Sequence, residues 1–172
     1  MTPFSTFLIE SRRDAFMQDV ERHAETHLRR IKHAKNSDFG TGSRTRERIE
    51  HPDIPGGYLD ITRMAPNFHH VSFEYEPNVH GAPGHKEISE LTANAIGFSL
   101  AVMRDRLDDN PHLKFGFDPL TGTHNSMYSR GLIPHINKSK SGMLGSLKGD
   151  VDPDDGSDIA FTISHRFPND TV

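Results

Sequence analysis

The 172-residue sequence contains no cysteine. Disulfide bonds, thiolate zinc sites and cysteine nucleophiles are therefore excluded. It also lacks any run near the roughly 18 apolar residues that would cross a bilayer. The opening residues, MTPFSTFLIESRRD, have neither the basic start nor the long apolar segment of a signal peptide. We therefore expect no contact with a membrane.

Apolar residues are also scarce, at 33% of the chain. This share supports a thin core, and the length fits a single domain over residues 1–172. The net charge of -4 argues against wholesale coating of nucleic acid, although non-specific contact with DNA phosphates remains open.

The strongest pattern lies between Ile88 and Leu107, where apolar residues recur every three or four positions and predict a helix. Two adjacent stripes line it: Ile88, Leu91, Ala95, Phe98 and Val102, then Ile96, Leu100, Met103 and Leu107. A helix apolar over so much of its surface belongs inside, with partners on both sides. Gly97 in its middle predicts that another backbone passes close by.

The remaining periodicities predict an α+β fold, a small and mostly antiparallel sheet packed against this central helix. An amphipathic helix is expected over about 11–35, preceded over 1–10 by an arm or a short helix. Strands are expected at 58–63, 68–75, 113–117 and 159–165, with a further strand or helical turn within 142–151. Residues 42–57 read as loop, and 118–142 as a long loop that is functional or ordered by a partner. The expected core includes Phe73, Phe98, Leu100 and Phe161.

Charge is unevenly distributed in the C-terminal third. All charged residues of the stretch 120–148 are basic: Arg130, Lys138, Lys140 and Lys148. All charged residues of the stretch 150–158 are acidic, among them Asp150, Asp152, Asp154 and Asp155. One interpretation is a pair of solvated loops. The other is a basic face and an acidic face that meet in a head-to-tail homo-oligomer.

Histidine is abundant, with twelve residues, four of them between His69 and His85. A metal site could draw on His70, His80 and His85, because imidazole is a common metal ligand. Successive strand residues face opposite ways, so only one of His69 and His70 could contribute. No established metal-ligand spacing is present. Solvated or hydrogen-bonded histidines therefore remain the alternative.

Two H-x-S triplets offer an enzymatic reading, in which His70 with Ser72 and His124 with Ser126 act as base and acid on a phosphodiester. The triplets resemble the paired H-x-T/S motifs of two-histidine phosphodiesterases. The sequence has no phosphate-binding loop and no nucleophile elbow. We therefore expect no catalytic activity and no cofactor.

The C-terminal third resembles the tail-completion or neck proteins of long-tailed phages. The resemblance rests on Ser141-Gly142-Met143-Leu144-Gly145-Ser146-Leu147, an Asp154-Asp155-Gly156 turn, and the alternating Ile159, Phe161 and Ile163. It implies a virion subunit that forms a cyclic ring at the head–tail junction or tail end, against portal, adaptor or tail-tube proteins. The implied location is the virion, and the host cytoplasm during assembly.

Overall fold

The computed structural model describes residues 3–34, 45–75, 85–117, 128–151 and 161–168, with side chains from Arg12 in the first range and from Leu91 in the third. In chain order the elements are α1 (Pro3–Ala34), β1 (Arg46–Glu50), β2 (Gly57–Ala65), β3 (Phe68–Tyr75), α2 (His85–Asp109), β4 (Lys114–Phe117), the π-turn η2 (Tyr128–Leu132), α4 (Ile133–Lys138), the 3-10 turn η3 (Leu144–Ser146), β5 (Leu147–Val151) and β6 (Phe161–His165).

The six strands form one sheet in the order β1-β2-β3-β4-β6-β5. All neighbours are antiparallel except β3 and β4, which are parallel and are connected through α2. The α+β prediction with a mostly antiparallel sheet is therefore confirmed.

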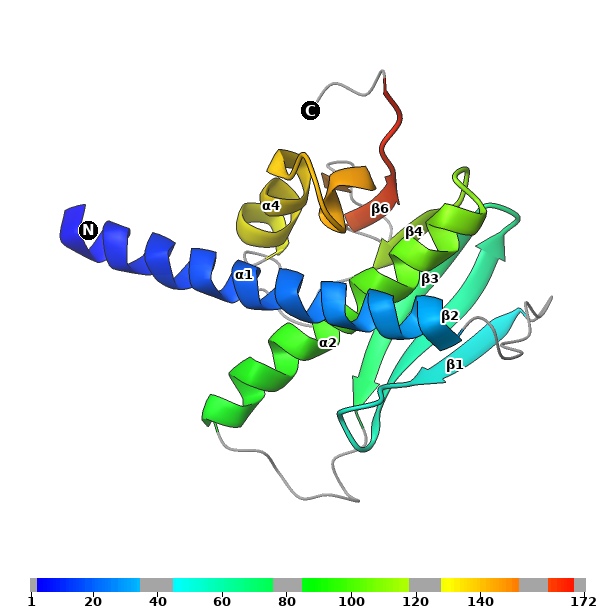
Figure 1. The fold of residues 1–172 in the computed structure, drawn as a ribbon, viewed down its shortest axis with the longest axis horizontal. Coiled ribbons are helices and arrows are strands. Elements are labelled where there is room, and N and C mark those ends of the chain that lie inside the picture. Colours follow the sequence, from blue (N-terminus) through cyan, green and yellow to red (C-terminus); the bar gives the residue numbers. More distant parts are fainter. Residues whose placement is uncertain (1–2, 35–44, 76–84, 118–127, 152–160, 169–172) are drawn as a thin grey trace.

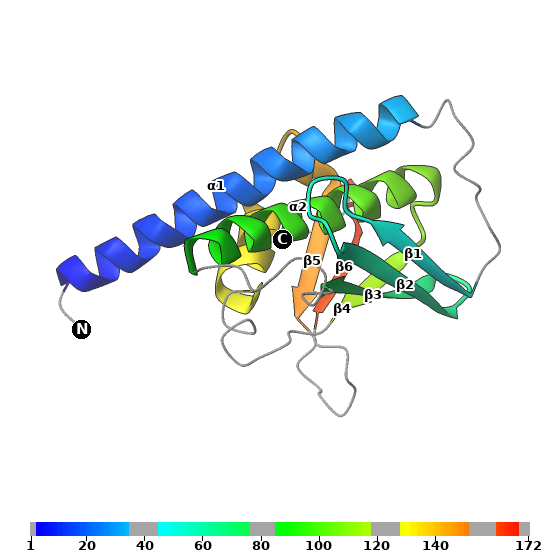
Figure 2. The ribbon, with the colours of Figure 1, turned by 90° about the horizontal axis from the view of Figure 1, so that it is seen from below.

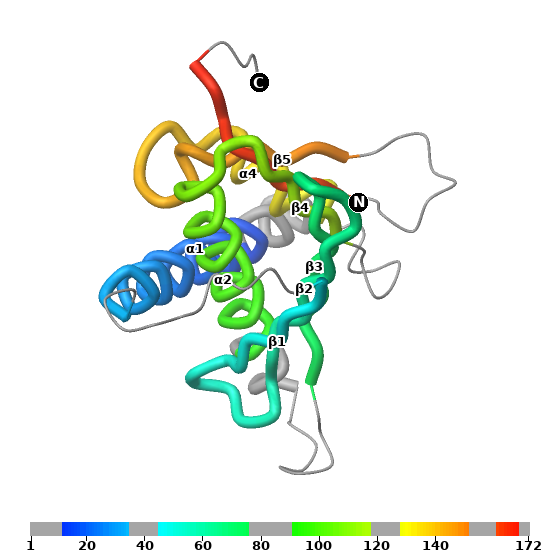
Figure 3. Tube along the Cα trace, turned by 90° about the vertical axis from the view of Figure 1, so that its right-hand side faces the viewer, coloured from blue at the N-terminus to red at the C-terminus, as the bar shows by residue number. Residues whose placement is uncertain are grey.

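The helices stack on the sheet in layers, with α2 between α1 and the strands (Figure 1; Figure 3). This position explains why α2 is apolar over so much of its surface. Gly97 lies against α1, whereas residues of both stripes, among them Leu91, Ala95, Leu100 and Met103, face the sheet side. A Cβ built at Gly97 would lie 2.8 Å from both Ala24 N and Val20 O of α1. The predicted close backbone is thus the backbone of α1.

The core joins α1, α2, α4 and the sheet in a single cluster. Phe98, Leu100 and Phe161 are buried in it as expected. Phe73 is half-buried and packs against the cluster from β3. Among the described residues, no helix is long and apolar enough to cross a membrane.

Three predicted boundaries are wrong. β1 lies inside the predicted 42–57 loop; its sequence RERIE has one apolar residue, and pairing with β2 holds it as an edge strand. Residues 128–138 of the predicted 118–142 loop are helical, because Leu132, Ile133 and Ile136 turn inward together. The helix predicted from about residue 11 starts at Pro3, so residues 3–10 are helical, as the second of the two alternatives for 1–10 expected, and they continue α1 without a break.

The α4 helix closes the outer edge of β5. The Asn137 amide donates to the Gly149 carbonyl and accepts from the Gly149 N–H, both at 2.9 Å, as a neighbouring strand would. From the end of β6, Arg166 donates to the carbonyl oxygens of Ile136 and Ser139 at the C-terminus of α4. The Asn137 side chain thus occupies the backbone hydrogen-bonding groups in the middle of the outer edge of β5.

Candidate functional site

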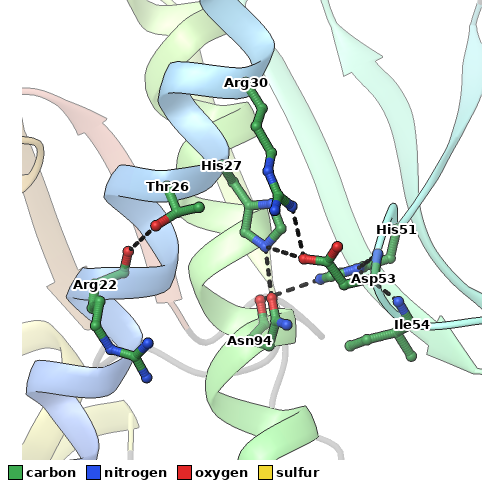
Figure 4. Close-up of polar contacts among 8 residues, drawn as sticks. All are labelled: Arg22, Thr26, His27, Arg30, His51, Asp53, Ile54 and Asn94. Atoms are coloured by element: carbon green, nitrogen blue, oxygen red, sulfur yellow. Dashed lines mark hydrogen bonds and ion pairs between the residues drawn. The ribbon is translucent and has the colours of Figure 1, made fainter.

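Five polar side chains from three separate elements meet where α1, α2 and the β1–β2 turn come together (Figure 4). We call His27, Arg30, His51, Asp53 and Asn94 the histidine cluster. His27 and Arg30 come from α1, His51 and Asp53 from the β1–β2 turn, and Asn94 from α2. The two imidazoles are 1% and 5% exposed, lie edge to face with centroids 4.9 Å apart, and both contact the ring of Phe98.

His51 organises the turn in which it lies. Its Nδ1 accepts the backbone N–H groups of Asp53 at 3.0 Å and of Ile54 at 3.1 Å. Since Nδ1 is the acceptor, the ring proton lies on Nε2, which points at the Asn94 carbonyl 3.4 Å away. Burial, followed by the nearby His27, lowers the pKa of His51 to about 4. His51 is therefore neutral at neutral pH.

His27 connects the two helices. Its Nε2 lies 2.6 Å from Asn94 Oδ1 and 3.9 Å from Asp53 Oδ2, so this nitrogen is the donor. Burial lowers the pKa of His27, partly offset by Asn94 and Asp53. Burial alone would raise the pKa of Asp53, but the Arg30 guanidinium, 2.8 Å away, holds it below its usual range.

The cluster has the composition of a metal site, because His27, His51 and Asp53 each offer a ligand atom within 4.8 Å of the others. The hydrogen bonds of His51 do not fit one. A metal at Nε2 would displace the proton to Nδ1, where two backbone N–H groups already point. Metal-bound histidines instead donate their second N–H to an acceptor. The cluster therefore fits a buried clamp that fastens the β1–β2 turn to both helices.

A pocket of about 450 Å³ lies between α2 and the sheet, on the side of α2 opposite α1. Its lining is mainly apolar and includes Leu91, Ala95, Leu100 and Met103 of α2, Phe73 and Tyr75 of β3, Phe117 at the end of β4, and Tyr128 and Leu132 of η2. Ser72, Glu74, Thr92 and Ser99 add polar groups. No residue of the histidine cluster lines this pocket.

The pocket exists because β3 and β4 part. They pair only at Phe68, His69 and His70, and in the described chain no strand pairs with that side of β3 from Val71 to Tyr75. β4 continues alongside β6 to Phe117 instead. Beside the opening between the two strands, buried residues of α2, among them Leu100 and Met103, form the floor of the pocket.

Of the two histidine–serine pairs in the enzymatic interpretation, one lies within the described residues. His70 and Ser72 share a face of β3, and the Ser72 hydroxyl donates to Glu74 at 2.6 Å. His124 and Ser126 lie outside the described residues. For the metal reading, His80 also lies outside them, and His85 is the first residue of α2. The described structure therefore brings none of these predicted groups together.

The charged stretches are only partly described. Arg130, Lys138 and Lys140 are exposed on or beside η2 and α4. Lys148 and Asp150 are two positions apart in β5, so their side chains lie on the same face of the sheet. The head-to-tail interpretation places the basic and acidic residues on opposite faces of the molecule. Asp152, Asp154 and Asp155 lie outside the described residues.

Sequence reasoning missed the histidine cluster, although one signal was present. The apolar spacing along α1 can pass through either His27 or Leu28, and in the structure His27 is buried at that position. A histidine in an apolar stripe indicates a buried polar partner. Its partner, Asn94, lies 67 positions away, and only the helix packing brings the two together.

No protein family, no curated protein and no solved structure was found to match this chain.

Proposed function

We propose that this chain is a structural subunit without catalytic activity, which forms a ring at the head–tail junction or tail end of a tailed phage. Its partners would be further copies and the portal, adaptor or tail-tube proteins of the particle. The proposal combines the sequence resemblance with one feature of the fold, the long first helix.

The N-terminal end of α1 extends past α2 and α4, away from the body of the molecule (Figure 1; Figure 2). Arg13 and Met17 lie against Gly131 of η2, so the packed part of α1 reaches at least to that turn. The turns before it, over residues 3–11, span about 14 Å at 1.5 Å per residue. A projecting helix of this length suits contact with a neighbour.

This projecting end is apolar in sequence. Phe4, Phe7 and Leu8 recur at the spacing of one helix face, and residues 1–9 contain no charged side chain. Apolar residues on a projecting helix favour an interface over a solvated surface. This is the observation that carries the proposal.

The chemistry of the described residues supports a non-catalytic role. The buried imidazoles of the histidine cluster are held by structural hydrogen bonds and lie outside the pocket. No histidine is among the described residues that line the pocket, and the carboxylate that accepts from the Ser72 hydroxyl, Glu74, is exposed.

The test is to express the full chain together with portal, adaptor and tail-tube proteins encoded beside it, and to image the purified assemblies by electron microscopy. We expect the chain as a ring on one of these partners. Purified particles that lack the chain by mass spectrometry would contradict the proposal, and so would turnover of a phosphodiester that is abolished by His70→Ala.

A further inference from the structure

We propose that the pocket between α2 and β3 receives the N-terminal end of α1 from a second copy of this chain. This inference rests on the proposed ring and names the surfaces that would join its subunits. Two features of the same molecule carry it: an apolar pocket without a described occupant, and an apolar helix end without a described partner.

The size of the pocket is the first argument. Protein interiors are close-packed, and the voids that remain are few and small. A largely apolar space of about 450 Å³ is within the range of built binding sites. Its floor residues Leu100 and Met103 are 1% and 4% exposed, so the pocket reaches the core. A space of this kind favours an apolar occupant.

The layer order makes the occupant a different copy. The pocket opens on the sheet side of α2, whereas α1 packs on the other side (Figure 3). The contact at Gly97 fixes α1 there, and its N-terminal end points away from the body (Figure 2). A chain cannot place this end in its own pocket without giving up that contact.

The chemistry of the two surfaces is complementary. An amphipathic helix binds an apolar groove through anchors at i, i+3 and i+4, which is the spacing of Phe4, Phe7 and Leu8. The N-terminus of a helix carries partial positive charge. Glu74, exposed at the pocket, offers a carboxylate to it, and the uncharged residues 1–9 bring no acid to oppose that carboxylate.

A contact of this kind is heterologous, because each copy supplies one helix end and one pocket. Such contacts form rings when the rotation between copies closes, and filaments when it does not. Subunits would therefore join head to tail through apolar packing, independently of the charged stretches over 120–158.

Sedimentation velocity of the full chain, over a concentration series to about 200 µM, tests the contact. We expect oligomers that grow with concentration. Phe7→Arg places a charge on the apolar face of the helix end. Ser99→Phe fills the pocket, where the Ser99 hydroxyl donates to Ala95 O within its own helix. Each should weaken self-association more than about tenfold, as loss of an interface anchor does. Thr6→Arg, on the opposite helix face, is the matched control and should assemble normally.

Mixing the two variants distinguishes a heterologous contact from a two-fold one. Each variant retains one intact surface, so an equimolar mixture should give dimers and nothing larger. A mixture that stays monomeric overturns the inference. If both variants assemble like the wild type, the contact lies elsewhere, and the proposed ring stands.

A second measurement guards against a variant that fails to fold. Because the chain has no cysteine, Leu8→Cys and Ser99→Cys in separate copies place one thiol on each of the two proposed surfaces, and a disulfide between positions 8 and 99 forms only when both variants are present. Oxidation of the mixture should give this cross-linked dimer, which peptide mass spectrometry distinguishes from the 8–8 and 99–99 dimers of each variant alone. Absence of this cross-link overturns the inference, and so does a wild-type chain that stays monomeric or carries a small apolar molecule in native mass spectra. The particle experiment judges the proposed function separately.

Discussion

Replacing Gly97 by alanine should destabilise the protein, although alanine is the better helix former. The added Cβ would lie 2.7 Å from His23 Cβ, 2.8 Å from Ala24 N and 2.8 Å from Val20 O. Carbon atoms pack best at about 3.5–4.0 Å. Two of the three atoms belong to the α1 backbone, so rotation of a side chain cannot relieve the clash and the helices must separate.

The balance can be estimated from two opposing terms. Removing a glycine from a helix interior gains about 1 kcal/mol. Overpacking a well-packed interface costs about 1–3 kcal/mol, and occasionally more. Because backbone atoms block relaxation, we expect the cost at the upper end and a net loss of about 2 kcal/mol. For a chain of this size, that loss lowers Tm by about 4–8 °C.

Thermal unfolding followed by circular dichroism measures the effect, with Gly131→Ala as the matched control. A Cβ at Gly131 would meet the flexible end of Met17 at 2.9 Å and of Arg13 at 3.4 Å, which can both move. The control should therefore change Tm much less. A Gly97→Ala variant whose Tm is unchanged or raised would refute the close packing of α1 on α2.

Three further predictions concern the clamp, the core and the sheet edge. The pKa of His51 in the folded protein is about 4, below its ordinary value of 6.5, so folding favours the neutral ring. The contribution of His51 to the free energy of unfolding should be complete above pH 6.5 and should fall by up to about 3 kcal/mol as the pH drops toward 4. Urea unfolding across this range measures the loss, and His51→Asn, which can accept the same N–H groups without titrating, should flatten the profile. Phe98→Ala should cost about 3–5 kcal/mol, because the ring is 3% exposed and supports both imidazoles; an unchanged urea midpoint would contradict its place in the core. Asn137→Leu removes both hydrogen bonds to Gly149 and should cost about 1–3 kcal/mol, with faster amide exchange at Gly149 as the diagnostic readout.

The sequence predicts those helices and strands in which apolar residues recur regularly along the whole element. α2 was predictable because its two apolar stripes leave little polar surface, and β3 because its residues alternate. Gly97 could be interpreted correctly, since a glycine inside such a helix needs a packing reason. In each case the local pattern and the tertiary environment agree.

The missed elements are those whose stability comes from distant partners. β1 alternates in exposure, but charged residues occupy most of it, so its hydrophobicity does not alternate. α4 has six residues and includes Pro134, which is too short for a periodicity to emerge. The pocket depends on where β3 and β4 separate, and no local pattern encodes that point.

The two outer strands have a consequence for solubility. At β1, Thr45 O accepts from Arg63 N–H, and His51 N–H donates to Gly57 O. In an antiparallel pair, successive residues direct their backbone groups alternately toward and away from the neighbouring strand, so those of Arg46, Arg48 and Glu50 point away from β2. Those three positions carry exposed charges of both signs.

At the other outer strand, Asn137 already occupies the backbone groups of Gly149. Charged edges and blocked edges are how natural sheets resist uncontrolled strand addition, the route to amyloid-like aggregation. In the described sheet, one outer strand is therefore protected by charge and the other by a side chain that takes the place of a neighbouring strand.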